Sequence, residues 1–154
     1  MEVFHKLGQT LEEQWRRQDY AGAAFPDLAA ALLEGADELG QIDTRDILRW
    51  IVREPALPAQ QDARSAFSDL AITFYETPRF FVSALMWLDG TTAIHQHSFS
   101  GAFRVLAGGS LHTRYRFTET RRVNDHFRLG TLDRQGVELL TTGSVRRIES
   151  AETF

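Results

Sequence analysis

Residues 110–117 read SLHTRYRF, and their side chains alternate strictly in character. In an extended chain, successive side chains point to opposite faces, so every second residue shares a side. The His and the two Arg residues therefore share one face, and the other face carries Leu111, Thr113, Tyr115 and Phe117. A period of two residues predicts a β-strand with one apolar and one solvated face.

The flanking segments extend this pattern in both directions. Residues 72–75 and 80–88 are short runs rich in aromatic and branched side chains, bounded by Pro78 and by Asp89 followed by Gly90. Further runs, HFRLGTL, VELLTT and SVRRIE, are separated by residues 133–136 and by Gly143. Strands at roughly ten-residue spacing with turns between them predict an antiparallel β-barrel or sandwich over residues 72–154.

Residues 1–71 instead have the spacing of helices. Apolar side chains recur every three or four positions up to about Arg17, and Thr10 with Glu13 fits a capping box. Pro26 suits the first turn of a second helix, which Gly35 interrupts.

A third helix is predicted for the segment TRDILRWIVRE, which Asp43 precedes as a cap and Pro55 follows. One more helical segment is suggested by the spacing of Ala63, Phe67 and Leu70. The predicted fold class is thus α+β, with N-terminal helices packed on a C-terminal antiparallel barrel or sandwich, which we expect to be incomplete.

Composition indicates the number of domains and the cellular compartment that we expect for this chain. With 154 residues, 43% of them hydrophobic, the chain suits one globular domain spanning residues 1–154. It has no apolar run of about 18 residues and no recognisable signal peptide, so we expect a soluble protein that does not enter a membrane. Cysteine is absent, which fits a cytoplasmic location and excludes disulfides and thiol nucleophiles.

Charge divides the chain into the same two parts. Residues 1–79 carry eight Lys or Arg against fourteen Asp or Glu, a net charge of −6, whereas residues 80–154 carry nine Arg against seven acids, a net charge of +2. Arg alternates with aromatic residues around residue 115, a pattern found in RNA-binding proteins and also on solvated strand faces. The overall charge of −4 argues against a nucleic-acid partner, which requires a concentrated positive field.

Two of the five histidines lie in residues 91–109, which read TTAIHQHSFSGAFRVLAGG. In an extended chain His95 and His97 project to the same side, so both imidazoles can reach one metal ion. The spacing alone leaves a structural role equally open.

This stretch resembles the first motif of the cupin superfamily, whose pattern is G-x5-H-x-H-x3-4-E-x6-G. Gly90, His95, His97 and Gly109 match it approximately, although Gly90 is one residue closer than the pattern requires. Ala102 stands where the pattern has its glutamate ligand. Cupins of the cysteine dioxygenase type also lack that carboxylate and bind ferrous iron through three histidines.

The resemblance implies a metal-dependent oxygenase with a non-haem iron site, acting on a small thiol or carboxylic acid. His95 and His97 would be metal ligands, and Fe(II) is the expected metal, with another divalent ion as the alternative. The family's third histidine belongs to a later motif, and here no histidine follows His126. Three explanations stay open: a fragment whose third ligand lies beyond Phe154, which we favour; substitution by His112 or His126; or a lost or weak site.

A non-catalytic cupin-like module that binds a small molecule or a partner is the alternative function. The predicted strands are too few to close a barrel comfortably, and an open sheet edge would favour a homodimer.

Arg104 is the candidate for substrate binding. It shares the strand parity of Ala102, so it would enter a barrel near the metal and bind a substrate carboxylate. A structural ion pair with an acidic residue such as Glu138 explains the same arginine equally well.

Overall fold

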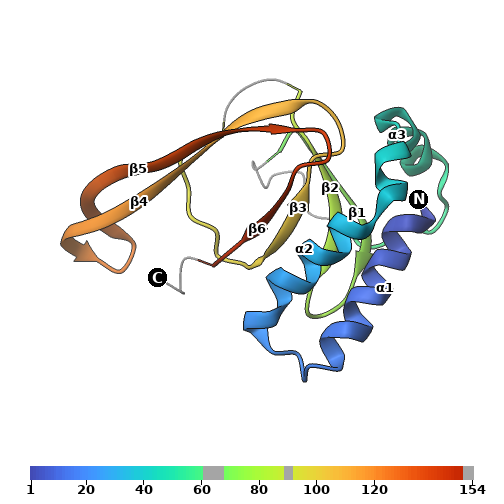
Figure 1. Ribbon diagram of the computed structural model, residues 1–154, viewed down its shortest axis with the longest axis horizontal. Coiled ribbons are helices and arrows are strands. Elements are labelled where there is room, and N and C mark those ends of the chain that lie inside the picture. The colour runs from blue at the N-terminus through green and yellow to red at the C-terminus, as the bar shows by residue number, and fades with distance from the viewer. Residues whose placement is uncertain (61–67, 89–91, 151–154) are drawn as a thin grey trace.

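The computed structural model describes residues 1–60, 68–88 and 92–150, and it confirms the α+β class (Figure 1). Three helices precede the strands in the chain. The helices are α1 (Glu2–Arg16), α2 (Phe25–Gly35) and α3 (Thr44–Arg53), with short 3-10 turns at Gly22–Ala24 and Asp37–Gln41. The strands are β1 (Leu70–Glu76), β2 (Phe81–Met86), β3 (Gly101–Arg104), β4 (Gly109–Asn124), β5 (Phe127–Thr141) and β6 (Val145–Ile148).

The described strands pair into three separate two-stranded antiparallel sheets, β1 with β2, β3 with β6 and β4 with β5. Within the described residues these sheets do not close into a barrel. The antiparallel pairing of the strands confirms the sequence prediction. A closed barrel, one of the two predicted architectures, is not found among the described strands. The long β4–β5 hairpin extends away from the helices, as Figure 1 shows.

The helix predictions hold except at two points. The Asp43 side chain accepts a hydrogen bond of 2.8 Å from the backbone N–H of Arg45, so it caps α3 as expected. Thr10, in contrast, lies in the middle of α1, which already begins at Glu2, and the predicted capping box is wrong. The apolar side chains of α1 recur at helical spacing from Phe4 onward and continue past Thr10. Packing of this apolar face on the core stabilises the helix more than a capping hydrogen bond at Thr10 would.

The predicted fourth helical segment is wrong at Leu70, which begins β1 and pairs with Met86. Ala63 and Phe67 lie outside the described residues. In the described residues the first strand therefore starts at Leu70, where β2 supplies a hydrogen-bonding partner that the local sequence does not reveal.

The segments HFRLGTL and VELLTT, predicted as two strands with a turn at residues 133–136, belong to one continuous strand, β5. Arg114 pairs with Gly136 and Tyr115 with Arg134, so one extra residue of β5, Gln135, is accommodated at this point. A β-bulge of this kind absorbs an inserted residue without ending the strand.

The core lies between the helices and the β1–β2 sheet. Ile72 is fully buried, Leu39 and Ile47 nearly so, and the rings of Phe4 and Phe74 stack with centroids 4.1 Å apart. A second cluster joins Leu11, Ala29 and Phe80 to Trp15, Phe25 and their apolar neighbours.

Gly8 lets α1 approach this sheet closely, because any Cβ at that position would overlap the Tyr75 ring.

Candidate metal site

His95 and His97 lie next to each other in the structure. Their ring centroids are 5.0 Å apart and their planes are nearly perpendicular, at 88°. Residues 92–100 contain no strand, so the expected extended segment is not the reason for this proximity. The His97 ring also contacts Phe99, at 5.3 Å between centroids.

A backbone carbonyl orients the His95 ring. His95 Nδ1 lies 2.7 Å from the carbonyl oxygen of Ala93, and since a carbonyl only accepts, Nδ1 is the donor. A neutral imidazole protonated at Nδ1 has its lone pair on Nε2. Metal-binding histidines are commonly held in this way, with one ring nitrogen donating to a carbonyl or carboxylate.

His97 is half-buried, and its environment disfavours the imidazolium form. Burial is the main cause that lowers the pKa of His97, followed by the charges of His95 and His112. A lowered pKa keeps the imidazole neutral near pH 7, which is the form that binds a metal.

His112 belongs to a polar cluster between the β4–β5 hairpin and β6. Its Nδ1 lies 3.0 Å from Glu138 Oε1, and these two residues are cross-strand partners. Arg146 of β6 donates to the same carboxylate from Nε, at 3.0 and 3.1 Å, and from Nη2, at 2.6 Å. Hydrogen bonds from Arg146, and next from His112, lower the pKa of Glu138 to about 2.

The separation of the two histidine rings is compatible with a shared metal ion. Two imidazoles bound to one ion at about 2.1 Å have ring centroids about 5 Å apart, close to the separation seen here. Nevertheless, among residues 1–60, 68–88 and 92–150 no three His, Asp or Glu side chains converge in an arrangement ready to hold an ion. His95 and His97 could therefore supply two ligands, and no third protein ligand is in place among the described residues.

The two alternative third ligands occupy very different places. His112 is near the base of the hairpin, within electrostatic reach of His97. His126 lies in the turn between β4 and β5, fourteen residues from His112, which corresponds to roughly 46 Å along an extended chain at about 3.3 Å per residue. His126 is consequently too far away to share an ion with His97 of the same chain.

Arg104 lies at the end of β3, and its side chain is directed to the helical layer. Arg104 Nη1 donates to the carbonyl oxygens of Leu33 and Ala36, at 2.6 and 3.0 Å. Both carbonyls belong to the C-terminal end of α2, where a cation interacts favourably with the helix dipole. Ala102 packs against the second core cluster. Glu138, the acid considered as an ion-pair partner for Arg104, is instead bonded to Arg146 and His112.

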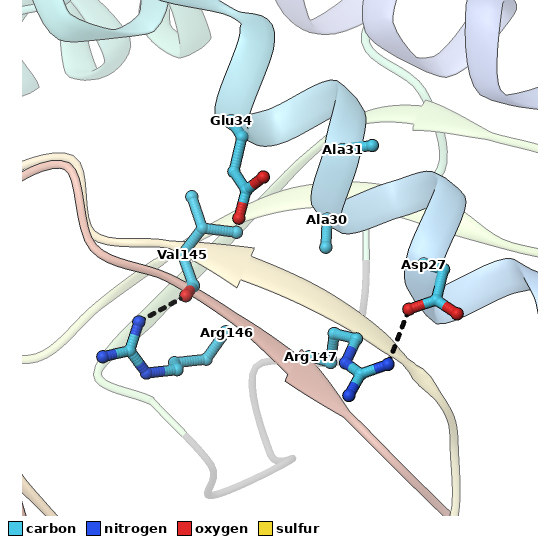
Figure 2. A pocket seen from close by; sticks show the side chains of 7 residues that line it. All are labelled: Asp27, Ala30, Ala31, Glu34, Val145, Arg146 and Arg147. Atoms are coloured by element: carbon cyan, nitrogen blue, oxygen red, sulfur yellow. Dashed lines mark hydrogen bonds and ion pairs between the residues drawn. The ribbon is translucent and has the colours of Figure 1, made fainter.

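A shallow groove of about 340 Å³ lies between α2 and β6 (Figure 2). Asp27 and Glu34 of α2 line one side, and Arg146 and Arg147 of β6 line the other. Arg147 Nη1 donates to Asp27 Oδ1 at 2.6 Å, which joins the helix to the strand across the groove. No local sequence pattern indicates this pair, because its members lie 120 positions apart.

Comparison with known proteins identifies no relative of this chain. No protein-family model matches it, and no curated protein or solved structure shows significant similarity. In the described part of the chain, no helix has the length and apolar character needed to cross a membrane.

Proposed function

We propose that the protein is a metal-dependent oxygenase of the cupin type, which acts on a small thiol or carboxylic acid through a non-haem iron(II) site. The observation that carries this proposal is the separation of the His95 and His97 rings, which suits joint binding of one ion. The hydrogen bond from His95 Nδ1 to the Ala93 carbonyl supports it, because metal-binding histidines are commonly oriented by a bond of this kind.

In this proposal His95 and His97 hold the metal as neutral imidazoles. The bound metal would supply the redox chemistry with oxygen, and the protein would supply substrate orientation and a partly desolvated site. Ala102 supplies no carboxylate ligand to this site, and its side chain packs against the second core cluster. Iron(II) suits a mixed imidazole and open-position site, and another divalent ion is the alternative.

His112 is the described residue best placed to complete the site. Its Nδ1–H, directed at Glu138, leaves Nε2 as the nitrogen with the lone pair, as in carboxylate–histidine–metal arrangements. A ligand from outside residues 1–154 is the other source. Binding of the ion would have to draw His112 towards the histidine pair, because the three rings do not yet converge.

The metal content of the purified protein tests this proposal directly. We expect near-stoichiometric iron by elemental analysis, and loss of that iron in the variant His95→Ala/His97→Ala. The matched control is His126→Ala, which removes an imidazole at the remote hairpin turn and should keep the iron. Metal-free wild-type protein that also fails to take up Fe(II), Mn²⁺, Ni²⁺ or Zn²⁺ would refute the metal site.

Oxygen consumption tests the chemistry once metal is bound. We expect turnover with a small thiol such as cysteine or 3-mercaptopropionate, and none in the double His variant. A protein that binds iron through these histidines but consumes no oxygen with any small thiol or carboxylic acid would support the alternative function, a non-catalytic small-molecule or partner-binding module. The incomplete donor set in the described residues is the observation that favours this alternative.

Arg104 stays a predicted anchor for a substrate carboxylate. Its observed bonds to α2 use Nη1, so a substrate would be bound through the other guanidinium nitrogens. The variant Arg104→Met should raise the KM for a carboxylate substrate by about 100-fold or more, as expected for loss of a charge-assisted pair. An unchanged KM, with the fold checked by circular dichroism, would assign Arg104 to helix capping alone.

The remaining expectations belong to the same proposal. We propose that the protein works in the cytoplasm, with a small-molecule substrate and without a nucleic-acid or membrane partner. Each two-stranded sheet has unpaired edges in the described residues, which supports pairing of two copies through an open edge.

A further inference from the structure

One side of α2 forms a wall of the groove in Figure 2. Asp27, Ala30, Ala31 and Glu34 follow one another at spacings of three and four positions or less, so they share one face of the helix. At a rise of 1.5 Å per residue, the two acidic residues stand about 10 Å apart along the helix, with the two alanines between them. Because alanine side chains are short, this middle part leaves a small apolar floor, opposite Val145 of β6.

The two arginines of the groove are already paired with carboxylates. Arg147 donates to Asp27 at 2.6 Å and lies 3.9 Å from Glu149. Arg146 bonds to Glu138 through Nε and Nη2, and its Nη1 donates to the carbonyl oxygen of the preceding residue. Since both positive charges are balanced within the protein, the groove has little attraction for an anionic ligand.

Glu34 is the charged residue of the groove that lacks such a partner. Among the described residues its carboxylate forms no hydrogen bond and no ion pair, and Figure 2 shows it directed towards Val145. Glu34 also lies in the last turn of α2, which has no basic residue and where the helix dipole disfavours a negative charge. Arg104 binds backbone carbonyls at this end of the helix, not the Glu34 side chain. The groove therefore has one uncompensated negative charge.

We propose that this groove binds a small organic cation, namely a primary ammonium group on a short alkyl chain. The ammonium group donates to the Glu34 carboxylate, and the chain lies over Ala30 and Ala31 towards Val145. The bond to Glu34 is charge-assisted, and the bound cation offsets the unfavourable position of the carboxylate at the end of the helix.

Two observations restrict the ligand to this class. A metal ion is less suitable, because in residues 1–60, 68–88 and 92–150 no three His, Asp or Glu side chains are grouped to hold one. The volume of about 340 Å³ is near the lower limit for ligand pockets, which favours a chain of a few carbon atoms. None of the lining residues is one of the histidines considered as metal ligands, so this site is independent of the proposed metal site.

The test is an NMR titration of the full chain with butylammonium, followed through the backbone amides. We expect saturable shifts for residues 30–34 and 145–147, with a dissociation constant of the order of 1 mM. Butyrate and butanol have the same chain length with a negative charge or none. They should bind at least about 10-fold more weakly, because they lack the charge-assisted bond.

The variant Glu34→Gln removes the charge and nearly keeps the shape of the side chain, and it should raise the dissociation constant for butylammonium by at least about 10-fold. The matched control is Glu38→Gln, which removes an exposed carboxylate outside the groove and should bind as the wild-type protein does. The amide spectra show whether both variants are folded.

Three outcomes would overturn the proposal. The first is the absence of saturable shifts in the groove at about 50 mM butylammonium, well above the expected dissociation constant. The second is equal affinity of Glu34→Gln and Glu38→Gln. The third is binding of butanol or butyrate as tight as that of butylammonium, which would show that the charge of Glu34 does not select the ligand.

Discussion

The β1–β2 sheet and the β4–β5 hairpin are both antiparallel pairs with one apolar face, yet they differ in what lies over that face. Helices cover β1 and β2, and Ile72, Phe74 and Ala84 are buried beneath them. The hairpin has longer strands and comparable apolar side chains, but Leu111 and Leu139 remain exposed. In the first sheet the apolar face is a core, and in the second it is a surface.

This difference shows that alternation and burial are separate properties. Alternation assigns side chains to two faces through local geometry alone. Burial depends on whether another element lies within contact distance, and the hydrophobic contribution to stability follows burial. The following substitutions compare the two sheets, and their expected effects decrease in order.

The largest effect is expected for Phe74→Ala in the covered sheet. Phe74 is buried and stacks on Phe4, so the variant leaves a cavity and should lower the free energy of unfolding by about 3–5 kcal/mol. The hairpin counterpart is Val123→Ala, which changes a half-exposed residue and should cost less than about 0.5 kcal/mol. Urea denaturation measures both, and equal losses would remove the contrast between the sheets.

The second comparison concerns the side-chain amide of Gln60, which forms hydrogen bonds with the backbone of β1 in the β1–β2 sheet. Gln60 accepts from the Thr73 N–H at 2.9 Å and donates to the Thr73 carbonyl at 3.0 Å, so it takes the place of a neighbouring strand. Gln60→Ala should cost about 1–3 kcal/mol, because the Thr73 backbone groups lose both partners. Gln135→Ala in the hairpin removes one exposed bond of 3.3 Å and should be nearly neutral in the same denaturation assay. A neutral Gln60→Ala variant would mean that water replaces the amide.

A smaller loss of stability is expected for a substitution in α3, one of the three helices. Asp43→Ala removes the cap of α3 and should cost about 1 kcal/mol by thermal denaturation. Asp43→Asn keeps an acceptor for the Arg45 N–H and should retain most of the stability. If the two variants were equally destabilised, the charge of Asp43, and not its hydrogen bond, would be the stabilising feature.

The smallest effect concerns the polar face of the hairpin, where it meets β6. The pKa of Glu138 is lowered to about 2 from 4.5 by Arg146 and His112, so the folded state favours the carboxylate. Its contribution to stability is present above about pH 4.5 and is lost as the pH falls through about 2.

NMR titration of the Glu138 side-chain carboxyl should place its midpoint near pH 2 in the wild-type protein. Arg146→Met removes the largest cause of the shift and should move the midpoint upward. A midpoint that does not move in Arg146→Met would show that Arg146 does not hold the carboxylate in solution.

Much of the fold was predictable because its signals are local. Helix boundaries near Asp43 and Pro26 follow from capping and from the backbone of proline, and the alternation around Tyr115 follows from strand geometry. The capping box at Thr10 failed because a continuous apolar face outweighs one side-chain hydrogen bond. The turn expected at residues 133–136 failed because the partner strand β4 continues past it, and only pairing reveals that.

The candidate site was predictable to a lesser degree. The proximity of His95 and His97 was expected from their spacing, although the extended segment that was to produce it is absent. The contacts of Arg104 with α2 and of Glu138 with Arg146 join distant parts of the chain, and no local pattern encodes them.

The sequence by itself determined the division into helices followed by strands, the two faces of each strand and the presence of two histidines in one short segment. These features depend on backbone geometry and on neighbours within a few residues. Only the tertiary structure decided which apolar face became a core, which arginine caps α2 and which carboxylate binds Arg146. Those outcomes depend on contacts between residues far apart in the chain, and such contacts form only when the elements pack.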